Sequence, residues 1–344
     1  MDFLGFIIIC VKVLLVFTAT MLGVLGMVYA ERRVSAFIQD RVGPNRVGPK
    51  GLLQPIADGI KFLMKEDIIP DRADKPIFIL APAILLIPAL MTFAVIPFGS
   101  PITLFGREIA LQVADINVGI LYILALTSIS VYGIVLAGWS SNNKYSLLGG
   151  LRSSAQLISY ELAMGLAVVS IILLSGSLKL NDIISNQQGS FLSWNIFKQP
   201  LAFLIFLVAV YAETNRLPFD LSEAEQELVG GYHTEYSSMK FAMFFMAEYA
   251  NMITAAALTV TLFFGGWDVP LLDEGSLGIV GTIISVLSFI MKTAFFLFLF
   301  IWVRWTFPRF RYDQLMRLGW KVLLPLALVN IFLTAGYLTL QASN

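Results

Sequence analysis

The sequence is poor in the residues that hold redox cofactors and metal ions. Its 344 residues include one cysteine, Cys10, and one histidine, His233. Iron–sulfur clusters need several cysteine thiolates, and haem and zinc sites draw mainly on histidine and cysteine. The sequence therefore excludes a disulfide framework, an iron–sulfur cluster and a multi-histidine metal site. It predicts that this chain carries no redox cofactor itself, so any such cofactor must sit on a partner chain or diffuse through the bilayer.

Charged residues are also scarce. They make up 13% of the chain and balance to a net charge of zero, whereas 58% of the residues are hydrophobic and the mean hydropathy is +0.80. The first apolar run has no positively charged segment before it and is too long for a cleaved signal peptide, so residues 3–29 are expected to form a retained helix. This composition is typical of a polytopic membrane protein and leaves no room for a soluble domain.

The apolar residues gather in eight segments, each able to cross a hydrocarbon core of roughly 30 Å, which needs about 20 helical residues. We therefore predict an all-α polytopic membrane protein, with one membrane domain over residues 1–344 and short amphipathic helices in its loops. The expected spans are residues 3–29, 77–98, 117–138, 155–178, 198–217, 240–265, 279–303 and 322–341.

Lysine and arginine concentrate in alternate loops. The first, third, fifth and seventh loops hold 9, 2, 1 and 5 of them, against 1, 2 and 0 in the second, fourth and sixth loops. Because cytoplasmic loops carry the excess of positive charge, both termini are expected outside, in the periplasm of a bacterial cell membrane; an organellar inner membrane is the alternative. The cytoplasmic loops are then residues 31–76, 139–154, 214–239 and 304–321.

One stretch between two apolar segments is strongly acidic: residues 213–235, ETNRLPFDLSEAEQELVGGYHTE. Asp220 is a good N-cap for a short helix that Gly230 and Gly231 end. Acidic residues at a helix start often only complement the helix dipole, but ionisable groups beside a membrane are costly and usually functional. The single basic residue here is Arg216, and the six carboxylates are Glu213, Asp220, Glu223, Glu225, Glu227 and Glu235.

Three glutamates on three predicted helices share one depth. Counting helical residues from the flanking lysines places Glu161, Glu213 and Glu248 several ångströms inside the cytoplasmic edge of the core. A single buried glutamate can simply link two helices by hydrogen bonds, but three glutamates at one depth in the membrane favour a path for protons. Asn251 and Thr254, one and two turns below Glu248 on the same face, could continue it.

Lys292 lies near the middle of the seventh predicted span, where a charge is costly. Two interpretations stay open: Lys292 is the counter-ion of a carboxylate, or it is a relay site for protons. Structural pairing is slightly favoured over the relay.

The first cytoplasmic loop has a distinctive pattern. The sequence RVGP occurs twice, at residues 41–44 and 46–49, so its arginines sit on tight Gly-Pro turns; a simple positive-inside anchor is the alternative. The stretch GLLQPIADGIKFLMKE, residues 51–66, has one apolar and one polar stripe, which predicts an amphipathic helix at the membrane interface or against a partner. The loop 304–321 interleaves arginines with aromatic residues, which suits a membrane exit better than nucleic acid, and no nucleic-acid partner is expected.

Four sequence motifs, taken in their order along the chain, resemble those of one protein family. The RVGP loop, GLLQPIADGIKFLMKE, PFDLSEAEQELVGGY and PRFRYDQLMRLGWK, spread along eight predicted helices, are similar to the H subunit of respiratory complex I, NADH:quinone oxidoreductase, the mitochondrial subunit-1 membrane chain. The membrane chains of energy-converting hydrogenases and of ferredoxin- or F420-dependent dehydrogenases share this pattern and remain an alternative. A proton-coupled transporter is less favoured because no inverted repeat is evident, and a mere scaffold would leave the buried glutamates unexplained.

The resemblance implies a subunit of a proton-translocating enzyme, with quinone as substrate and with FMN and iron–sulfur clusters on partner subunits. Those partners would be the soluble iron–sulfur subunits of the quinone module and antiporter-like membrane subunits. The chamber residues it implies are Arg32, Arg33, Asp58, Phe219, Asp220, Glu223, Glu225 and Glu227. Those expected on the proton path are Glu161, Glu213, Arg216, Glu248 and Lys292.

Overall fold

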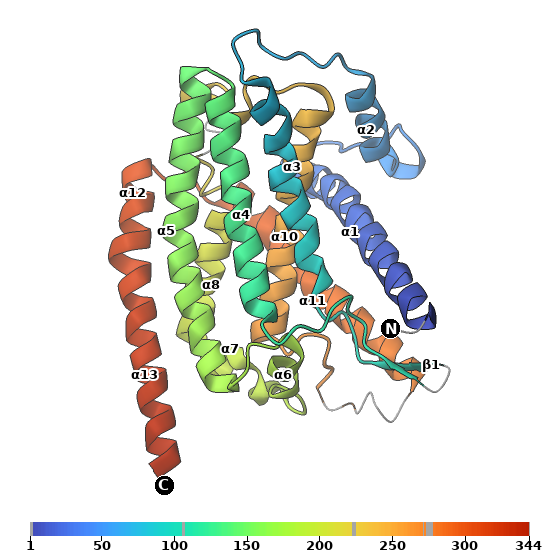
Figure 1. Ribbon diagram of the computed structural model, residues 1–344, viewed down its shortest axis with the longest axis vertical. Helices are drawn as coiled ribbons and strands as arrows, with labels where there is room; N and C mark the ends of the chain where they lie inside the picture. Colours follow the sequence, from blue (N-terminus) through green and yellow to red (C-terminus); the bar gives the residue numbers. More distant parts are fainter. Residues whose placement is uncertain (1–2, 105–106, 222–224, 271, 273–277, 344) are drawn as a thin grey trace.

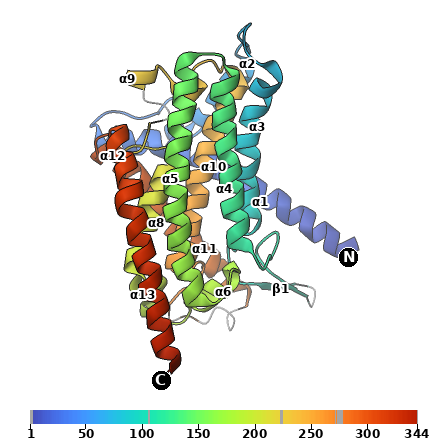
Figure 2. The same ribbon diagram turned by 60° about the vertical axis from the view of Figure 1, so that its left-hand side comes forward.

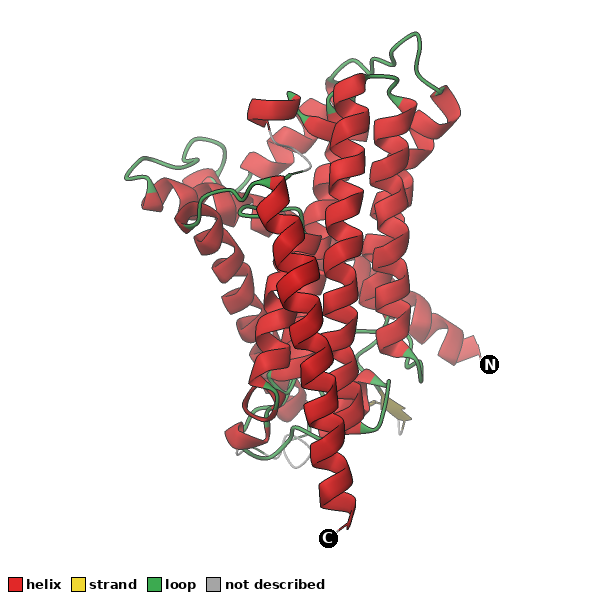
Figure 3. Cartoon of the chain, turned by 90° about the vertical axis from the view of Figure 1, so that its left-hand side faces the viewer, coloured by secondary structure: helices red, strands yellow, loops and turns green. Residues whose placement is uncertain are grey.

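The fold is known from a computed structural model, which describes residues 3–104, 107–221, 225–270, 272 and 278–343. Helices dominate it (Figures 1 and 3), as the sequence predicts. The long helices are α1 (Phe3–Ile38), α3 (Lys75–Met91), α4 (Gly119–Ser140), α5 (Lys144–Ser175), α8 (Pro200–Glu213), α10 (Ser238–Phe263), α11 (Ile279–Thr306) and α13 (Leu324–Ser343).

Shorter elements fill the connections. They are α2 (Gln54–Met64), α6 (Leu180–Ser185), α7 (Asn195–Lys198), α9 (Glu225–Leu228), α12 (Tyr312–Arg317), the 3₁₀ turns Pro49–Gly51, Thr92–Ala94, Phe191–Ser193 and Gly231–His233, and a π-helical turn Leu318–Leu323 that joins α12 to α13. In the described part of the chain, strands are limited to the hairpin of β1 (Ile102–Leu104) and β2 (Arg107–Ile109), in which Ile102 pairs with Ile109.

Seven helices are long and apolar enough to cross a membrane, among the residues that the structure describes. The predicted fifth span is the exception in length, because α8 has 14 residues and ends at Glu213. At about 1.5 Å per residue, it is roughly 21 Å long, less than a hydrocarbon core of about 30 Å. Glu213 is the last residue of α8 and the first residue of the acidic stretch.

Two helices run further than the hydropathy pattern predicts. α1 continues through Glu31 to Ile38, because residues 30–38 contain no glycine or proline to stop it. α5 begins at Lys144 rather than near residue 155, with the Asn143 side chain accepting a hydrogen bond from the Tyr145 N–H at 2.9 Å. A hydropathy pattern detects only the membrane-embedded part of such helices, so it predicts loops where their polar turns continue.

The helices form a bundle around α5 and α10. α5 packs between α4 and α8, with α13 on its outer side, while α3 packs against α4 and α10 (Figures 1 and 2). α1 and α11 lean against α10, and α2 lies at the end of the bundle away from both chain termini (Figure 1). The helices meet closely: a Cβ on Gly133 would lie 2.9 Å from the Leu85 nitrogen, so α3 and α4 touch through backbone.

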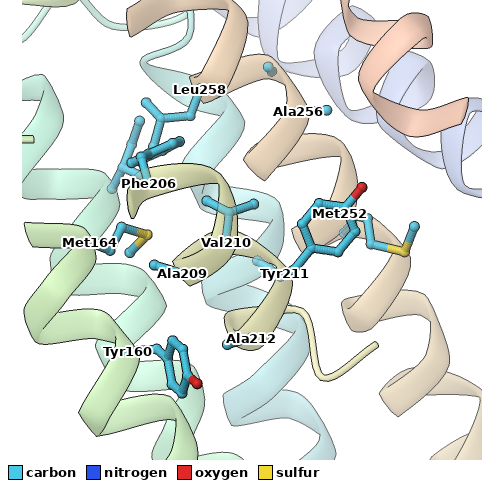
Figure 4. Close-up of a cluster of buried hydrophobic side chains, with 14 of the residues drawn as sticks. Tyr160, Met164, Phe206, Ala209, Val210, Tyr211, Ala212, Met252, Ala256 and Leu258 are labelled. Carbon is cyan, nitrogen blue, oxygen red and sulfur yellow. The ribbon is translucent and has the colours of Figure 1, made fainter. Parts of the chain in front are cut away.

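The core between α5, α8 and α10 combines small and large side chains. Figure 4 shows Tyr160 and Met164 of α5 facing Ala209 and Ala212 of α8, all buried. Small residues let membrane helices approach one another, and the larger ones fill the remaining space. The Tyr160 hydroxyl donates to the Leu315 carbonyl at 2.9 Å, which ties α12 to this core. The described charged residues of the acidic stretch lie at the edge of this packed core.

Candidate functional site

The first half of the acidic stretch is fixed against α5. The Gln156 side chain is fully buried and donates to the Ala212 and Phe219 carbonyls, each at 2.7 Å. The Phe219 ring packs on Tyr160, with ring centroids 5.4 Å apart, and on Phe310, at 5.5 Å. These contacts hold residues 212–220 between α5 and the segment before α12, so Arg216 and Asp220 have defined positions.

Arg216 is the centre of a buried ion-pair network. Its side chain is 7% exposed, and Nη1 lies 2.8 Å from Oε1 of Glu31 on α1. Its Nε pairs with the carboxylate of Glu248 on α10, and its guanidinium carbon lies 4.5 Å from the ring centre of Tyr249. A single arginine on the acidic stretch therefore links the carboxylates of two membrane helices.

The Glu31 carboxylate interacts with three donor side chains. Besides Arg216, it accepts a hydrogen bond from the Tyr249 hydroxyl at 2.9 Å and pairs with Arg304 at the end of α11. The same ends of α1 and α11 are joined by a hydrogen bond from Trp305 Nε1 to Ser35 Oγ at 2.7 Å. A buried carboxylate is stable as an ion only when it is paired and hydrogen-bonded, and Glu31 meets both conditions.

A cavity of about 260 Å³ opens beside this network. It is lined by four arginines and three carboxylates, so a polar head group entering it would meet both signs of charge. At its edge, Arg309 donates to Asp220 at 2.7 Å, which joins the acidic stretch to the segment after α11. The charged lining residues are Glu31, Arg32, Arg41, Arg216, Asp220, Glu248 and Arg304.

Glu161 and Glu213 form a second acidic site. Glu161 on α5 accepts a hydrogen bond from the Ser128 hydroxyl of α4, and Glu213 at the end of α8 lines the same small cavity as Thr127 of α4. The two carboxyl groups are close enough for their charges to repel each other. A cavity of about 20 Å³ adjoins Glu213, Asn251 and Thr254, and this volume is sufficient for one water molecule.

The remaining predicted chamber residues are scattered. Arg32 of α1 pairs with Asp58 of α2, an exposed pair that fixes the amphipathic helix beside the cavity. Arg33 turns away from the cavity, because its Nη1 donates to the Pro44 carbonyl at 3.1 Å. Glu227 pairs with Arg152 on the surface at 2.7 Å. Glu223 lies outside the described residues, as does the side chain of Glu225, which begins α9.

Lys292 lies away from the glutamates. Its ammonium group donates to the carbonyls of Phe264, Gly266 and Asp268 at 2.7–3.0 Å, just beyond the end of α10. The end of a helix leaves carbonyl groups without helical partners and carries partial negative charge, so a buried cation is stable there. Along α10 this place is about 24 Å from Glu248. The structure does not bring Lys292 into either acidic site.

Near the C-terminal end of the acidic stretch, aromatic side chains pack around His233. Its ring centre lies 5.2 Å from that of Phe241 and 5.0 Å from that of Tyr232. Burial among these rings lowers the pKa of His233 to about 4. Tyr236 stacks on Phe78 of α3 at 3.9 Å, and burial raises its pKa to about 12. Both residues are therefore neutral at neutral pH.

Sequence reasoning missed Glu31, Tyr249 and Arg304. Glu31 stands two residues beyond the predicted end of the first span and was assigned to a loop, although it is on α1. Arg304 was assigned to the positive anchors of the membrane exit. A helical continuation of α1 could have been recognised from the unbroken run after residue 29, but the pairing of these residues across helices has no signal in one sequence.

Comparison with known proteins shows which family the chain resembles. A family model described as NADH dehydrogenase matches residues 11–335. The H 1 subunit of the NADH-quinone oxidoreductase of Geobacter metallireducens is 57% identical over 96% of this chain and 96% of its own length. The H 1 subunit of Cytophaga hutchinsonii is 52% identical, covering 94% and 95% of the two chains, and NADH-quinone oxidoreductase subunit 8 of Rhodothermus marinus is 57% identical, covering 93% and 94%. The chain belongs to the family of the H subunit of NADH-quinone oxidoreductase, a membrane component of respiratory complex I.

Proposed function

We propose that this chain forms the membrane side of the quinone chamber of NADH:quinone oxidoreductase and couples quinone reduction to proton translocation through its glutamates. The observation that carries the proposal is the position of Arg216. It belongs to the stretch that borders the charged cavity, and it pairs with carboxylates on α1 and α10. A change of charge in the cavity therefore acts directly on two buried carboxylates.

The chamber part rests on the cavity of about 260 Å³ and its surroundings. Arg32, Asp220 and Arg304 line it, and α2 stands beside it with the apolar side chains Ile56, Ile60 and Leu63 exposed. An amphipathic helix of this kind lies at a membrane interface, where a lipophilic quinone would enter. The electrons would come from FMN and iron–sulfur clusters on soluble partner subunits, docked over loops that the positive-inside rule places in the cytoplasm.

The coupling part rests on the two acidic sites. Moving a proton against about 150 mV takes roughly 3.5 kcal/mol. Removing one partner from a buried ion pair costs about 3–5 kcal/mol, so protonation of Glu31 or Glu248 releases Arg216 with an energy of the same order. Asn251 and Thr254 of α10 follow Glu248 and border the small cavity beside Glu213. This arrangement leads from the charged cavity to the Glu161–Glu213 pair, beside which antiporter-like subunits would pack.

The relatives favour NADH as the electron donor over hydrogen, ferredoxin or F420. All three relatives compared, at 52–57% identity, are NADH-quinone oxidoreductase subunits. A transporter would not need an arginine shared between a soluble-facing stretch and two helices, and a scaffold would not need buried carboxylates at all. The chain is assigned to a bacterial cell membrane, with both termini outside.

Glu213→Gln tests the coupling. We expect the complex to assemble, because the amide keeps the size and one hydrogen-bond acceptor, but proton translocation by sealed membrane vesicles should fall strongly. Asp67→Asn is the control, since Asp67 lies on the surface in a pair with Lys240, and such pairs contribute little. If Glu213→Gln leaves quinone reductase activity and proton translocation at wild-type levels, Glu213 has no part in coupling.

A further inference from the structure

Two adjacent side-chain hydroxyls of α4 lie beside the Glu161–Glu213 pair, one next to each glutamate. The Ser128 hydroxyl donates to Glu161, and Thr127 lies beside Glu213, where the two residues line the same small cavity. Both hydroxyls also lie 2.9 Å from the same backbone oxygen, the carbonyl of Leu124 one turn earlier. Neither hydroxyl is among the residues that the sequence pattern points to, because serine and threonine are common in membrane helices.

The shared carbonyl limits what these hydroxyls can do together. A hydroxyl has one hydrogen to donate, and a carbonyl oxygen has two lone pairs. In α4 the Leu124 carbonyl already accepts the helical N–H of Ser128, four residues on. One lone pair remains for two hydroxyls, so only one of them can donate to Leu124 with full strength at a time.

The hydroxyl that does not donate to Leu124 can donate to its glutamate. An ionised carboxylate requires a donor, whereas a protonated carboxyl group has a hydrogen of its own to give. The hydroxyl that donates to Leu124 still has lone pairs, so it accepts from a protonated glutamate. Every hydrogen bond in the group is therefore satisfied when one glutamate is ionised and the other is protonated.

Electrostatics favours the same state. Two carboxylates close together in a low-dielectric site do not readily ionise together, and one of them retains a proton. The other titratable side chains on the neighbouring turns of α5, α8 and α10 are Tyr160, Tyr211, Glu248 and Tyr249. Of these, Glu248 is paired with Arg216. That ion pair does not reduce the repulsion between the carboxylates of Glu161 and Glu213.

We propose that Thr127 and Ser128 are positioning residues that make Glu161 and Glu213 share one proton in two alternative arrangements. In one arrangement Ser128 donates to ionised Glu161 while Thr127 donates to Leu124 and accepts from protonated Glu213. In the other, the roles of the two hydroxyls are exchanged. This inference rests on the proposed proton path and adds to it the hydrogen bonds that let the proton pass between the two glutamates.

The test uses hydroxyl-deleting and hydroxyl-retaining variants of the whole complex. Thr127→Val removes the hydroxyl at nearly constant shape, and Thr127→Ser keeps it; Ser128→Ala and Ser128→Thr are the corresponding pair. Thr261→Val is the matched control, because Thr261 is a fully buried threonine whose hydroxyl donates within its own helix, to the Ala257 carbonyl at 2.8 Å. Assembly of each variant is checked by the recovery of the intact complex.

The main readout is the infrared difference spectrum between the oxidised and reduced complex, in the region of protonated carboxyl groups. The band that Glu213→Gln abolishes reports Glu213. In Thr127→Val this band should move to higher frequency, since its carboxyl group loses a hydrogen-bond partner, and Thr127→Ser and Thr261→Val should leave it unchanged. Loss of a hydrogen bond to a charged group shifts the proton distribution between the glutamates about tenfold or more, so protons translocated per NADH should also fall.

A Glu213 band and a proton ratio that are the same in Thr127→Val as in wild type would overturn the inference. If Thr127→Val does not assemble, the Glu161 band in Ser128→Ala decides the question in the same way. The proposed function is tested separately, because Glu213→Gln alone decides it. Loss of translocation in Glu213→Gln with wild-type behaviour of both hydroxyl-deleting variants would retain the proton path and reject the role of the hydroxyls.

Discussion

At the scale of single residues, the charged groups in the described structure differ in what surrounds them. Glu31 and Arg216 are buried and contact each other, whereas Glu227 and Arg152 pair on the surface. Removing one partner of the buried pair strands a charge at a cost of about 3–5 kcal/mol, whereas an exposed pair contributes about 0–1 kcal/mol. The proposed coupling therefore depends on the buried residues and not on the number of acidic residues in the stretch 213–235.

His233 gives a pH-dependent prediction at this scale. Its pKa is about 4 in the folded chain, below the ordinary value of 6.5, because it is buried. Between these values the unfolded chain binds more protons, so stability is full above about pH 6.5 and falls as the pH decreases toward about 4. At about pH 5 the loss should be about 2 kcal/mol.

This loss can be measured as the thermal midpoint of the purified complex at about pH 7.5 and about pH 5. We expect the decrease to be larger in wild type than in His233→Gln, whose side chain does not titrate. Equal decreases in the two proteins would show that His233 is not held neutral by burial.

At the scale of elements, the sequence predicted the helices better than their ends. Apolar runs identified every long helix of the described structure, because burial in a membrane requires them. The shared depth of Glu161, Glu213 and Glu248, which follows from counting along helices, stays a prediction. The continuation of α1 through Glu31 and the short α8 could not be predicted in this way. Polar helical turns outside the membrane lack a hydropathy signal, and their stability comes from tertiary contacts.

The side-chain partners could be predicted least. The family resemblance implies that Arg216 is on the proton path, but its bonds to Glu31 and Glu248 depend on how α1 and α10 pack. Lys292 illustrates the same point, since the carbonyls that it contacts follow α10 in the chain and reach it only in the folded bundle. One sequence specifies which residues are costly to bury, and the fold decides which partner stabilises each.

The attachment of the acidic stretch to α5 provides a prediction at the element scale. Gln156→Leu keeps the size of the side chain but removes its two hydrogen bonds to the Ala212 and Phe219 carbonyls. Each bond contributes about 0.5–1.5 kcal/mol, so local opening of residues 212–221 should become about tenfold more frequent. Hydrogen exchange followed by mass spectrometry should show faster exchange in the peptides that cover this segment.

Gln187→Leu is the matched control. Gln187 is also fully buried and also donates to backbone carbonyls, those of Ile183 and Thr261, but at the other end of α10. Its replacement should speed exchange near α6 and leave residues 212–221 unchanged. Unchanged exchange of this segment in Gln156→Leu would mean that Gln156 does not hold it.

At the scale of the whole molecule, the bundle has buried central helices and outer helices with exposed apolar faces. In their most hydrophobic windows, 50% of the residues of α5 are buried within this chain, but only 11% of those of α1 and 22% of those of the α12–α13 helix. Lipid or partner subunits must cover the outer helices. The Glu161–Glu213 pair lies on the inner helices α5 and α8, whereas the Arg216 network also includes Glu31 of the outer helix α1. The packing of α1 therefore affects that network.

We place the link between quinone chemistry and protons at Glu248, which pairs with Arg216 beside the charged cavity and lies one turn from Asn251 on α10. The most direct test is the number of protons translocated per NADH oxidised in sealed vesicles that carry Glu248→Gln. We predict that this ratio falls by about half or more while a measurable part of the quinone reductase activity remains, since each buried charge removed disturbs coupling by several kcal/mol. A wild-type ratio in this variant would contradict that placement.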